Sequence, residues 1–288
     1  MKLHGYCGLL IILAAEILLF SGNRFVGFCF TPIVWTGYVI FIDSIVSRIK
    51  GHSLLTTDKQ ELLIVVVISI GVWWLFEFYN APRFWRSSTE IWWHYHNLAR
   101  NPFLRRAGYD WAFATIFPAL FLTAEVFQST SFVNRVRLRP VRLSKTILYI
   151  MVSVGAIGAI IPLVYISSWF VPLVWLSFIF FLDPINYLRG WPSISGDLAR
   201  GDWRRLWSLL ASGLLCGVLW EFWNYWAISK WTYTVPFFGD IKIFEMPILG
   251  FLGFPPFAVE CWVIYIFLRS LLQPLASETN DRAIFVRP

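Results

Sequence analysis

Two six-residue segments of the chain carry a carboxyl and an amide side chain at the same spacing. The segments are LFEFYN and LWEFWN, in which Glu77 matches Glu221 and Asn80 matches Asn224. Residues three apart share a face of a helix, so each acid lies beside its amide. A neutral carboxylic acid can donate a proton in a site that excludes water, although such a pair can also join helices as a structural contact. We expect a functional role, because acids within membrane segments are functional candidates and this pair occurs twice.

Glu245 and Glu260 are the next candidate acids, and Asp110 and Glu125 stand at the matching positions of the first half. Glu245 precedes Pro247, where a helix or a re-entrant segment would begin, so a capping role is expected there as much as a functional one. Glu260 has only apolar residues one helical turn further on, so its partner must come from another helix or from a ligand. A functional role is favoured at Glu260 for that reason.

Aromatic side chains are concentrated around these acids. Around and after the second acid–amide pair the chain supplies Trp220, Trp223, Trp231 and Tyr233. Tryptophan and tyrosine collect at membrane interfaces, but that tendency does not explain a cluster at the acids. Ring faces attract a desolvated positive charge, so the cluster suits a carbocation, and it equally suits a flat conjugated ligand. We predict that these four residues bind substrate, together with Glu77 and Asn80.

The motifs that mark metal, nucleotide and diphosphate sites are absent from the sequence. The four histidines form no HxxxH or HxxHH box, the four cysteines have no metal-ligand spacing, and there is no GxGxxG, P-loop or DDxxD motif. Each of these patterns would indicate a particular cofactor or metal. We therefore predict acid–base chemistry with no metal and no cofactor.

The elements that must position these residues are membrane helices. The chain has 288 residues, of which 58% are hydrophobic and 14% are charged, far from the average of soluble proteins. Apolar runs long enough to cross a bilayer recur along it. These runs predict an all-α polytopic membrane protein with about eight transmembrane helices, at 7–22, 27–46, 61–80, 111–130, 145–164, 168–187, 205–227 and 247–272.

The basic residues lie in the gaps between the apolar runs. With the N-terminus placed in the cytoplasm, 16 of the 24 lysine and arginine residues fall on the inner side. The positive-inside rule then predicts a multi-pass protein of the inner (cytoplasmic) membrane with both termini cytoplasmic. The net charge of +7 is accordingly a sign of topology, and no nucleic-acid partner is expected. The oligomeric state is left open.

The chain also carries a long internal match. PIVWTGYVIFID, ending at Asp43, aligns without a gap with PLVWLSFIFFLD, ending at Asp183, and WHY at 93–95 resembles WTY at 231–233. Both aspartates are expected to be N-caps of short interfacial helices. An even number of helices per copy would give the copies one orientation, with a site at their interface. We predict two tandem four-helix repeats in parallel orientation, at 1–132 and 146–272. A basic linker at 133–145 joins them, and a tail follows at 273–288.

The second half resembles a known family in one extended segment. EFWNYWAISKWTYTVPFFGDIKIFEMPILG, followed by PPFAVEC, is similar to integral membrane proteins of carotenoid biosynthesis, of the lycopene cyclase domain and bisanhydrobacterioruberin hydratase type. Those proteins are built from duplicated helical units, and their carboxylates protonate or hydrate terminal alkenes. The resemblance covers about 210–265 and implies Glu221, Glu245 and Glu260 as acids. The Pro-x-Glu-Glu motif of the family is absent, because Cys261 follows Glu260.

The combined prediction is a membrane enzyme that cyclises, hydrates or isomerises an alkene of a polyisoprenoid or carotenoid-like lipid, and so belongs with the lyases or isomerases. Glu221 or Glu260 would be the general acid, and Asn224 would orient it. The alternative is a proton-coupled transporter or lipid-handling protein that uses the repeated glutamates, Glu77 among them, as a relay. A structural membrane subunit is the third possibility.

Overall fold

The computed structural model describes residues 1–81, 92–130, 133 and 138–272. Within these residues eight helices are long and apolar enough to cross a membrane. They are Leu3–Phe20, Phe30–Lys50, Lys59–Asn80, Pro102–Gln128, Lys145–Val164, Ser168–Leu188, Arg204–Trp226 and Ile248–Leu272. The prediction of a helical, polytopic membrane protein is thereby confirmed. Residues 134–137 of the predicted linker and the predicted tail, 273–288, lie outside the described residues.

The elements of the first half alternate long helices with short connections. In chain order they are α1 (Leu3–Phe20), α2 (Arg24–Phe28), α3 (Phe30–Lys50), α4 (Lys59–Asn80), β1 (Trp93–His96), α5 (Pro102–Ala114) and α6 (Ile116–Gln128). Helices α5 and α6 together form the fourth span, with a break at Thr115. The break falls three residues before Pro118, a residue type that cannot continue the backbone hydrogen bonds of a helix.

The second half follows the same order with additional short elements. They are α8 (Lys145–Val164), η1 (Ser168–Phe170), α9 (Val171–Val174), α10 (Ser177–Leu188), α11 (Ile194–Ala199), α12 (Arg204–Trp226), β2 (Lys230–Tyr233), β3 (Lys242–Ile243), β4 (Met246–Pro247), η2 (Ile248–Gly253) and α13 (Phe254–Leu272). The last α-helix begins at Phe254, directly after η2, and the two together form the eighth span.

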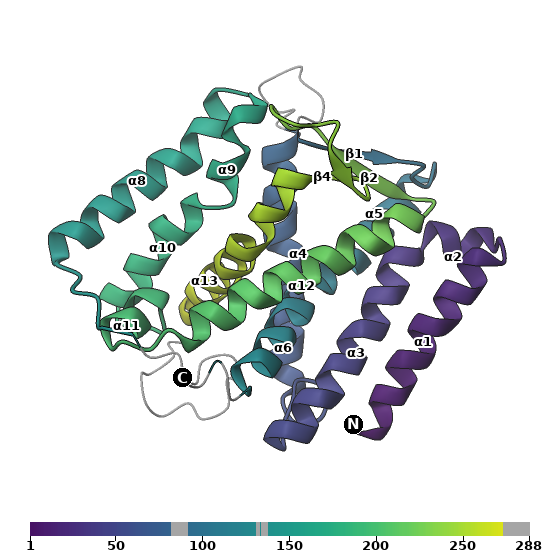
Figure 1. Ribbon diagram of the computed structural model, residues 1–288, viewed down its shortest axis with the longest axis horizontal. Coiled ribbons are helices and arrows are strands. Elements are labelled where there is room, and N and C mark those ends of the chain that lie inside the picture. Colours follow the sequence, from purple (N-terminus) through teal and green to yellow (C-terminus); the bar gives the residue numbers. More distant parts are fainter. Residues whose placement is uncertain (82–91, 131–132, 134–137, 273–288) are drawn as a thin grey trace.

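Two helical hairpins flank a central group of helices (Figure 1). The α1–α3 hairpin lies on one side, the α8–α10 hairpin on the other, and α4, α6, α12 and α13 lie between them. Glycines allow each hairpin to close tightly, since a Cβ on Gly8 would lie 2.6 Å from the carbonyl oxygen of Gly37, and one on Gly155 would overlap the backbone nitrogen of Phe181. Such close backbone contact is how small residues hold membrane helices together.

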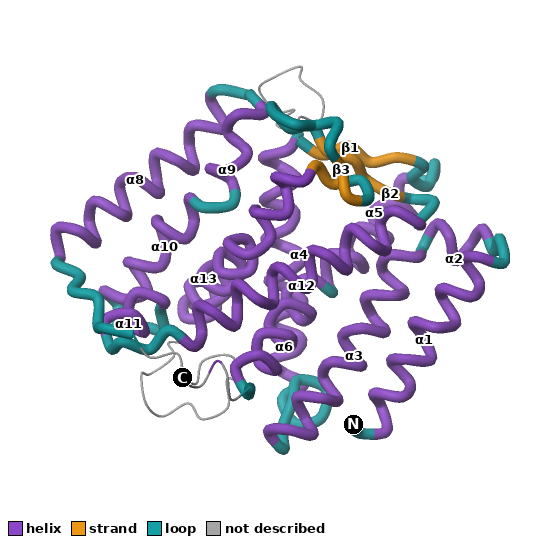
Figure 2. Tube along the Cα trace, viewed as in Figure 1, coloured by secondary structure: helices purple, strands orange, loops and turns teal. Residues whose placement is uncertain are grey.

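The spans end at two sides of the bundle, which we name by what they carry. The sheet side carries β1 and β2, the short strands at one end of the helices in Figure 2. The termini side is the opposite one, where α1 begins and α13 ends. On the termini side Glu61 of α4 is paired with Arg269 of α13, with Nε and Oε1 3.0 Å apart, and the Tyr265 hydroxyl donates to the same carboxylate. This buried ion pair joins the two halves of the chain.

Asp43 and Asp183 have a capping role, but their predicted position as N-cap residues is wrong. Both lie inside helices, in α3 and α10. Asp43 accepts hydrogen bonds from the backbone N–H of Leu55 at 3.1 Å and from the hydroxyl of Ser53. Asp183 accepts the backbone N–H groups of Ile194 and the next residue, at 2.7 and 2.8 Å, where α11 begins. Each aspartate thus satisfies orphan backbone donors of a following segment from a neighbouring helix.

Candidate functional site

A two-stranded antiparallel sheet closes the sheet side of the bundle. Strand β1 comes from the first half and β2 from the second, with Trp93 opposite Tyr233 and Tyr95 opposite Trp231. Alternate residues of a strand point to the same face, so these four aromatic side chains share one face of the sheet. The strands themselves were not predicted; the W-x-Y pattern that they contain has the period of two that a strand requires.

Asn80 and Asn224 hold the two strands by the same contacts. The Asn80 amide donates to the carbonyl oxygen of Trp93 at 2.8 Å, and its oxygen accepts from the backbone N–H of Trp93 at 3.2 Å. The Asn224 amide donates to the carbonyl oxygen of Trp231 at 2.8 Å and accepts the N–H of the same residue at 2.9 Å. Both amides are fully buried. Each asparagine therefore fixes its strand to the end of the helix that also carries the acid.

Glu77 receives three hydrogen bonds on one carboxyl oxygen. Its Oε1 accepts from the indole N–H groups of Trp73 at 3.0 Å and Trp93 at 3.1 Å, and from the hydroxyl of Tyr95 at 2.5 Å. Trp73 is one turn earlier on α4, while the other two donors come from β1. Sequence reasoning matched Tyr95 to Tyr233 but did not predict that these residues donate to the acids.

Glu221 has a related but simpler arrangement. Its Oε1 accepts from the hydroxyl of Tyr233 at 2.7 Å, and that hydroxyl in turn accepts from the indole N–H of Trp231 at 2.5 Å. The residue is fully buried, and its second oxygen, Oε2, has no hydrogen-bond partner among the described residues. A buried carboxyl oxygen without a partner is costly unless it carries a proton or meets a ligand.

The two predicted aromatic residues that flank Glu221 on α12 face another way. The ring of Trp220 packs against Trp35 of α3, with centroids 5.0 Å apart, and against Phe257 of α13 at 6.0 Å. The indole of Trp223 also contacts Trp35 and donates its N–H to Glu16 of α1 at 3.1 Å. Of the four aromatic residues predicted around Glu221, Tyr233 is hydrogen-bonded to its carboxyl, and Trp231 is hydrogen-bonded to Tyr233.

Glu260 lies on another face of the bundle. Its Oε1 accepts the backbone N–H of Phe178 at 3.3 Å, in the first turn of α10, and the ring of Phe178 packs on Tyr79 of α4. This confirms that its partner comes from another helix. Like Glu221, it is fully buried with Oε2 unpartnered among the described residues. The contacts of Glu260 are with α10, whereas those of Glu221 are with β2.

Glu245 lies just before the predicted boundary, because η2 and the last apolar span both begin at Ile248, directly after Pro247. It lies in the turn between β3 and β4 and forms an ion pair with Lys230, with Oε1 and Nζ 2.7 Å apart. Both side chains are partly exposed, which favours a structural role. Tyr225, four residues after Glu221 on α12, is 42% exposed and turns outward.

Asp110 and Glu125, the first-half acids that the sequence aligned with Glu245 and Glu260, make different contacts from those two residues. Asp110 accepts from the indole of Trp74 at 2.6 Å and pairs with Arg106. Glu125, near the end of α6, is paired with Lys50 on the termini side. Glu260 instead lies near the start of α13. Glu125 and Glu260 therefore do not occupy equivalent places.

No family, curated protein or solved structure matches this chain in the comparisons with known proteins. Among the described residues, no group of three or more histidine, cysteine, aspartate or glutamate side chains could hold a metal ion. The fold and site define a helical membrane protein in which a buried acid, Glu221, and a half-buried acid, Glu77, lie beneath a sheet that both halves build.

The two half-buried tyrosines of the sheet, Tyr95 and Tyr233, make stability sensitive to alkaline pH. Burial raises the pKa of Tyr95 well above its usual range, and the nearby Glu77 carboxylate raises it further. Burial and the Glu221 carboxylate shift the pKa of Tyr233 in the same direction. Tyrosines of the unfolded chain lose their protons near pH 10, about where free tyrosine does, so the unfolded state then binds fewer protons than the folded one.

We therefore expect the free energy of unfolding to fall as the pH rises above about 10. Alkaline unfolding followed by circular dichroism in detergent checks this. The double variant Tyr95→Phe/Tyr233→Phe should show a shallower fall, because it removes both groups. An unchanged slope in that variant would contradict the assignment.

Proposed function

We propose that the chain is an integral membrane enzyme that protonates an alkene of a polyisoprenoid or carotenoid-like lipid, with Glu221 as the general acid. The observation that carries the proposal is the state of the Glu221 carboxyl. One oxygen is held by Tyr233 and the other is buried without a partner among the described residues. A carboxyl fixed in this way can present a proton to an apolar ligand from which water is excluded.

The proposed reaction begins with a proton transfer. Glu221 gives its proton to one carbon of the double bond, whose π electrons form the new C–H bond and leave a cation on the neighbouring carbon. The rings of Trp231 and Tyr233 stabilise that cation, as aromatic faces do. Loss of a proton from this cation completes an isomerisation. In a cyclisation, the π electrons of a second double bond first attack the cation to form the ring C–C bond, and the new cation that this leaves then loses a proton. Addition of water with release of a proton completes a hydration. The carboxylate recovers a proton in this last step.

Asn224 acts in this proposal as a positioning residue. It holds the backbone of β2 at Trp231 and so keeps Tyr233 at the acid. Glu260 is the second candidate acid, since its Oε2 is also buried and unpartnered among the described residues. No metal or cofactor has a role in the proposed step.

We infer further that the chain is a duplication of one four-helix unit, at 1–132 and 146–272. Matching ring contacts support this. Trp35 of α3 lies 5.0 Å from Trp220 of α12, and Trp175, the counterpart of Trp35, lies 5.2 Å from Phe76 of α4. In both cases a residue of one half contacts the acid-bearing helix of the other half. The sheet pairs the W-x-Y segments of the two halves about their central residues.

The membrane and the orientation also belong to the proposal. Counting basic residues favours the inner (cytoplasmic) membrane with the termini side in the cytoplasm. The sheet and the two acid–amide pairs would then lie toward the outer leaflet. The substrate would be a membrane lipid that enters from the bilayer.

Expression in cells that accumulate linear carotenoids tests the enzyme proposal. The expected result is a new pigment, resolved by chromatography and mass spectrometry, in cells that make the wild-type chain. An unchanged pigment profile with each acyclic precursor supplied would contradict it.

One observation favours a second candidate function, a proton-coupled transporter. Glu77 and Glu221 are both buried or half-buried beneath the same sheet and both accept from a strand tyrosine. An enzyme with one site has no need of two such acids. Solute-driven proton flux in proteoliposomes, lost equally in Glu77→Gln and Glu221→Gln, would support this candidate against the first.

A further inference from the structure

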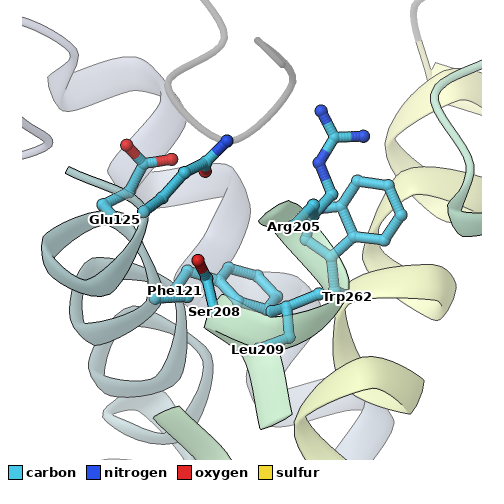
Figure 3. Close-up of a pocket in the computed structure, with 8 residues that line it drawn as sticks. Phe121, Glu125, Arg205, Ser208, Leu209 and Trp262 are labelled. Atoms are coloured by element: carbon cyan, nitrogen blue, oxygen red, sulfur yellow. The ribbon is translucent and has the colours of Figure 1, made fainter. Parts of the chain in front are cut away.

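A polar hollow opens on the termini side between α6, α12 and α13 (Figure 3). Its charged residues are Glu125 and Arg205, which stand on opposite sides of the hollow with the Ser208 hydroxyl between them. The Gln128 side chain also lines the hollow, and apolar or aromatic side chains form the rest of the lining, including Phe121 and Trp262. The hollow is therefore lined by both polar and apolar side chains. It lies at the opposite end of the bundle from the sheet.

The charges in the hollow are already compensated by other residues. Glu125 is paired with Lys50, and Arg205 is paired with Asp197, with Nη1 and Oδ2 2.8 Å apart. Ser208 differs, because it is 1% exposed and its hydroxyl has no hydrogen-bond partner among the described residues. A buried hydroxyl without a partner indicates an uncharged hydrogen-bonding ligand, and water is the smallest one.

Polar side chains continue from Ser208 along one face of α12. Ser212 and Cys216 follow at four-residue spacing, and both are fully buried. The Cys216 thiol lies 3.7 Å from the hydroxyl of Thr123 on α6, which lies 2.8 Å from the hydroxyl of Tyr38 on α3. We call these five residues the polar stripe. It ends at Tyr38, whose ring packs 6.2 Å from that of Trp223. Trp220 and Trp223, which both pack on Trp35, are the aromatic cluster of α12.

Packing alone does not require this face to be polar. Aligning the two acid–amide segments matches Ser208, Ser212 and Cys216 of α12 with Ile64, Ile68 and Val72 of α4. Ile68 and Val72 are buried as well. Serine in a membrane helix often joins helices as a hydrogen-bonding contact, and Ser212 does donate to the carbonyl of Leu120 at 2.5 Å. That role does not account for Ser208, which has no such acceptor among the described residues.

We propose that the hollow is a water site and that the polar stripe admits water and protons from the termini side to the aromatic cluster of α12. The Ser208 hydroxyl binds the first water molecule. The hydroxyl and thiol groups that follow offer both donors and acceptors, which a chain of water molecules needs. The route ends beside Trp223, whose indole donates to Glu16 of α1; in an enzyme of the proposed kind it would supply the water for hydration from that side of α12. Only that use of the route rests on the proposed function.

The native cysteines allow a direct test in the unmodified protein. Cys216 belongs to the polar stripe, whereas Cys261 of α13 does not, and both are fully buried. Hydroxyl radicals generated by X-ray radiolysis of water oxidise side chains next to ordered water, and mass spectrometry reads the result residue by residue. In nanodiscs we expect the Cys216 thiol to be oxidised several-fold faster than that of Cys261. Equal slow oxidation of both thiols would overturn the proposal.

A blocked variant and its matched control sharpen the test. Ser208→Leu removes the first hydroxyl and fills the hollow, and it should lower the oxidation of Cys216 to the level of Cys261. Ile64→Leu, at the matching position of α4, should leave the oxidation of Cys216 unchanged. Unaltered oxidation of Cys216 in Ser208→Leu would overturn the route through the hollow. Because no product is measured, the result is independent of whether the enzyme proposal holds.

Discussion

Replacement of Glu221 by glutamine is expected to lower the rate of lipid conversion by about 10²–10⁴-fold, the usual contribution of a general acid. Glutamine keeps the size of the side chain, and its carbonyl oxygen can still accept the hydrogen bond from Tyr233, but it has no acidic proton. The fold should therefore survive while the reaction is lost. Conversion of a linear isoprenoid by the purified protein in nanodiscs, followed by chromatography, measures the effect.

Glu77→Gln is the matched control for this variant. Its carboxyl stands in the corresponding place on α4 but accepts three donors instead of one on its Oε1. We expect this variant to keep most of the wild-type rate. If Glu221→Gln converts substrate as fast as the wild type, Glu221 is not the acid. Equal loss in both variants would instead favour the symmetric transport pathway.

The second large effect is expected on stability, from Asn224→Leu. Leucine branches at Cγ as asparagine does, but it removes both hydrogen bonds to the backbone of Trp231. Each polar group left without a partner costs about 1–3 kcal/mol, so the loss of both partners should lower the free energy of unfolding by about 2–6 kcal/mol. Unfolding in mixed detergent micelles, followed by tryptophan fluorescence, measures the change.

Two further variants separate the amide contacts from general packing at this position. Asn224→Asp keeps an acceptor for the N–H of Trp231 but loses the donor to its carbonyl, so it should be destabilised less than the leucine variant. Asn80→Leu should be destabilised at least as much, since the Asn80 oxygen accepts two backbone N–H groups. Wild-type stability in Asn224→Leu would mean that the amide does not hold β2.

The membrane helices could be predicted from the sequence because their signal is strong and local. A run of about 20 apolar residues has the length that a helix needs to cross a bilayer, and the eight runs agree with the eight spans of the structure. The same holds for the acid–amide pairs, because three-residue spacing on a helix fixes their common face. Glu221 and Asn224 are both fully buried and both engage β2, as their shared face predicts.

The parts that were missed depend on contacts between distant segments. Apolar runs do not reveal how a helix is rotated about its axis. The sequence therefore could not show that Glu260 contacts α10 whereas Glu221 contacts β2. The pairing of β1 with β2 spans more than 130 residues and involves only four residues per strand. Pro247 correctly marked the start of the last span, but nothing in the local sequence indicated that Glu245 pairs with Lys230. The W-x-Y period was the one available signal for the sheet.

Deuterium transfer from solvent to product tests the central claim most directly. The purified protein, in nanodiscs made up in D₂O, would be given a linear carotenoid, and the product would be analysed by mass spectrometry and NMR. A carboxyl that protonates the alkene exchanges with solvent, so the product should carry one deuterium bonded to carbon at the site of protonation. The Glu221→Gln variant should form no such product. A product without carbon-bound deuterium, or the same labelled product from Glu221→Gln, would contradict protonation by Glu221.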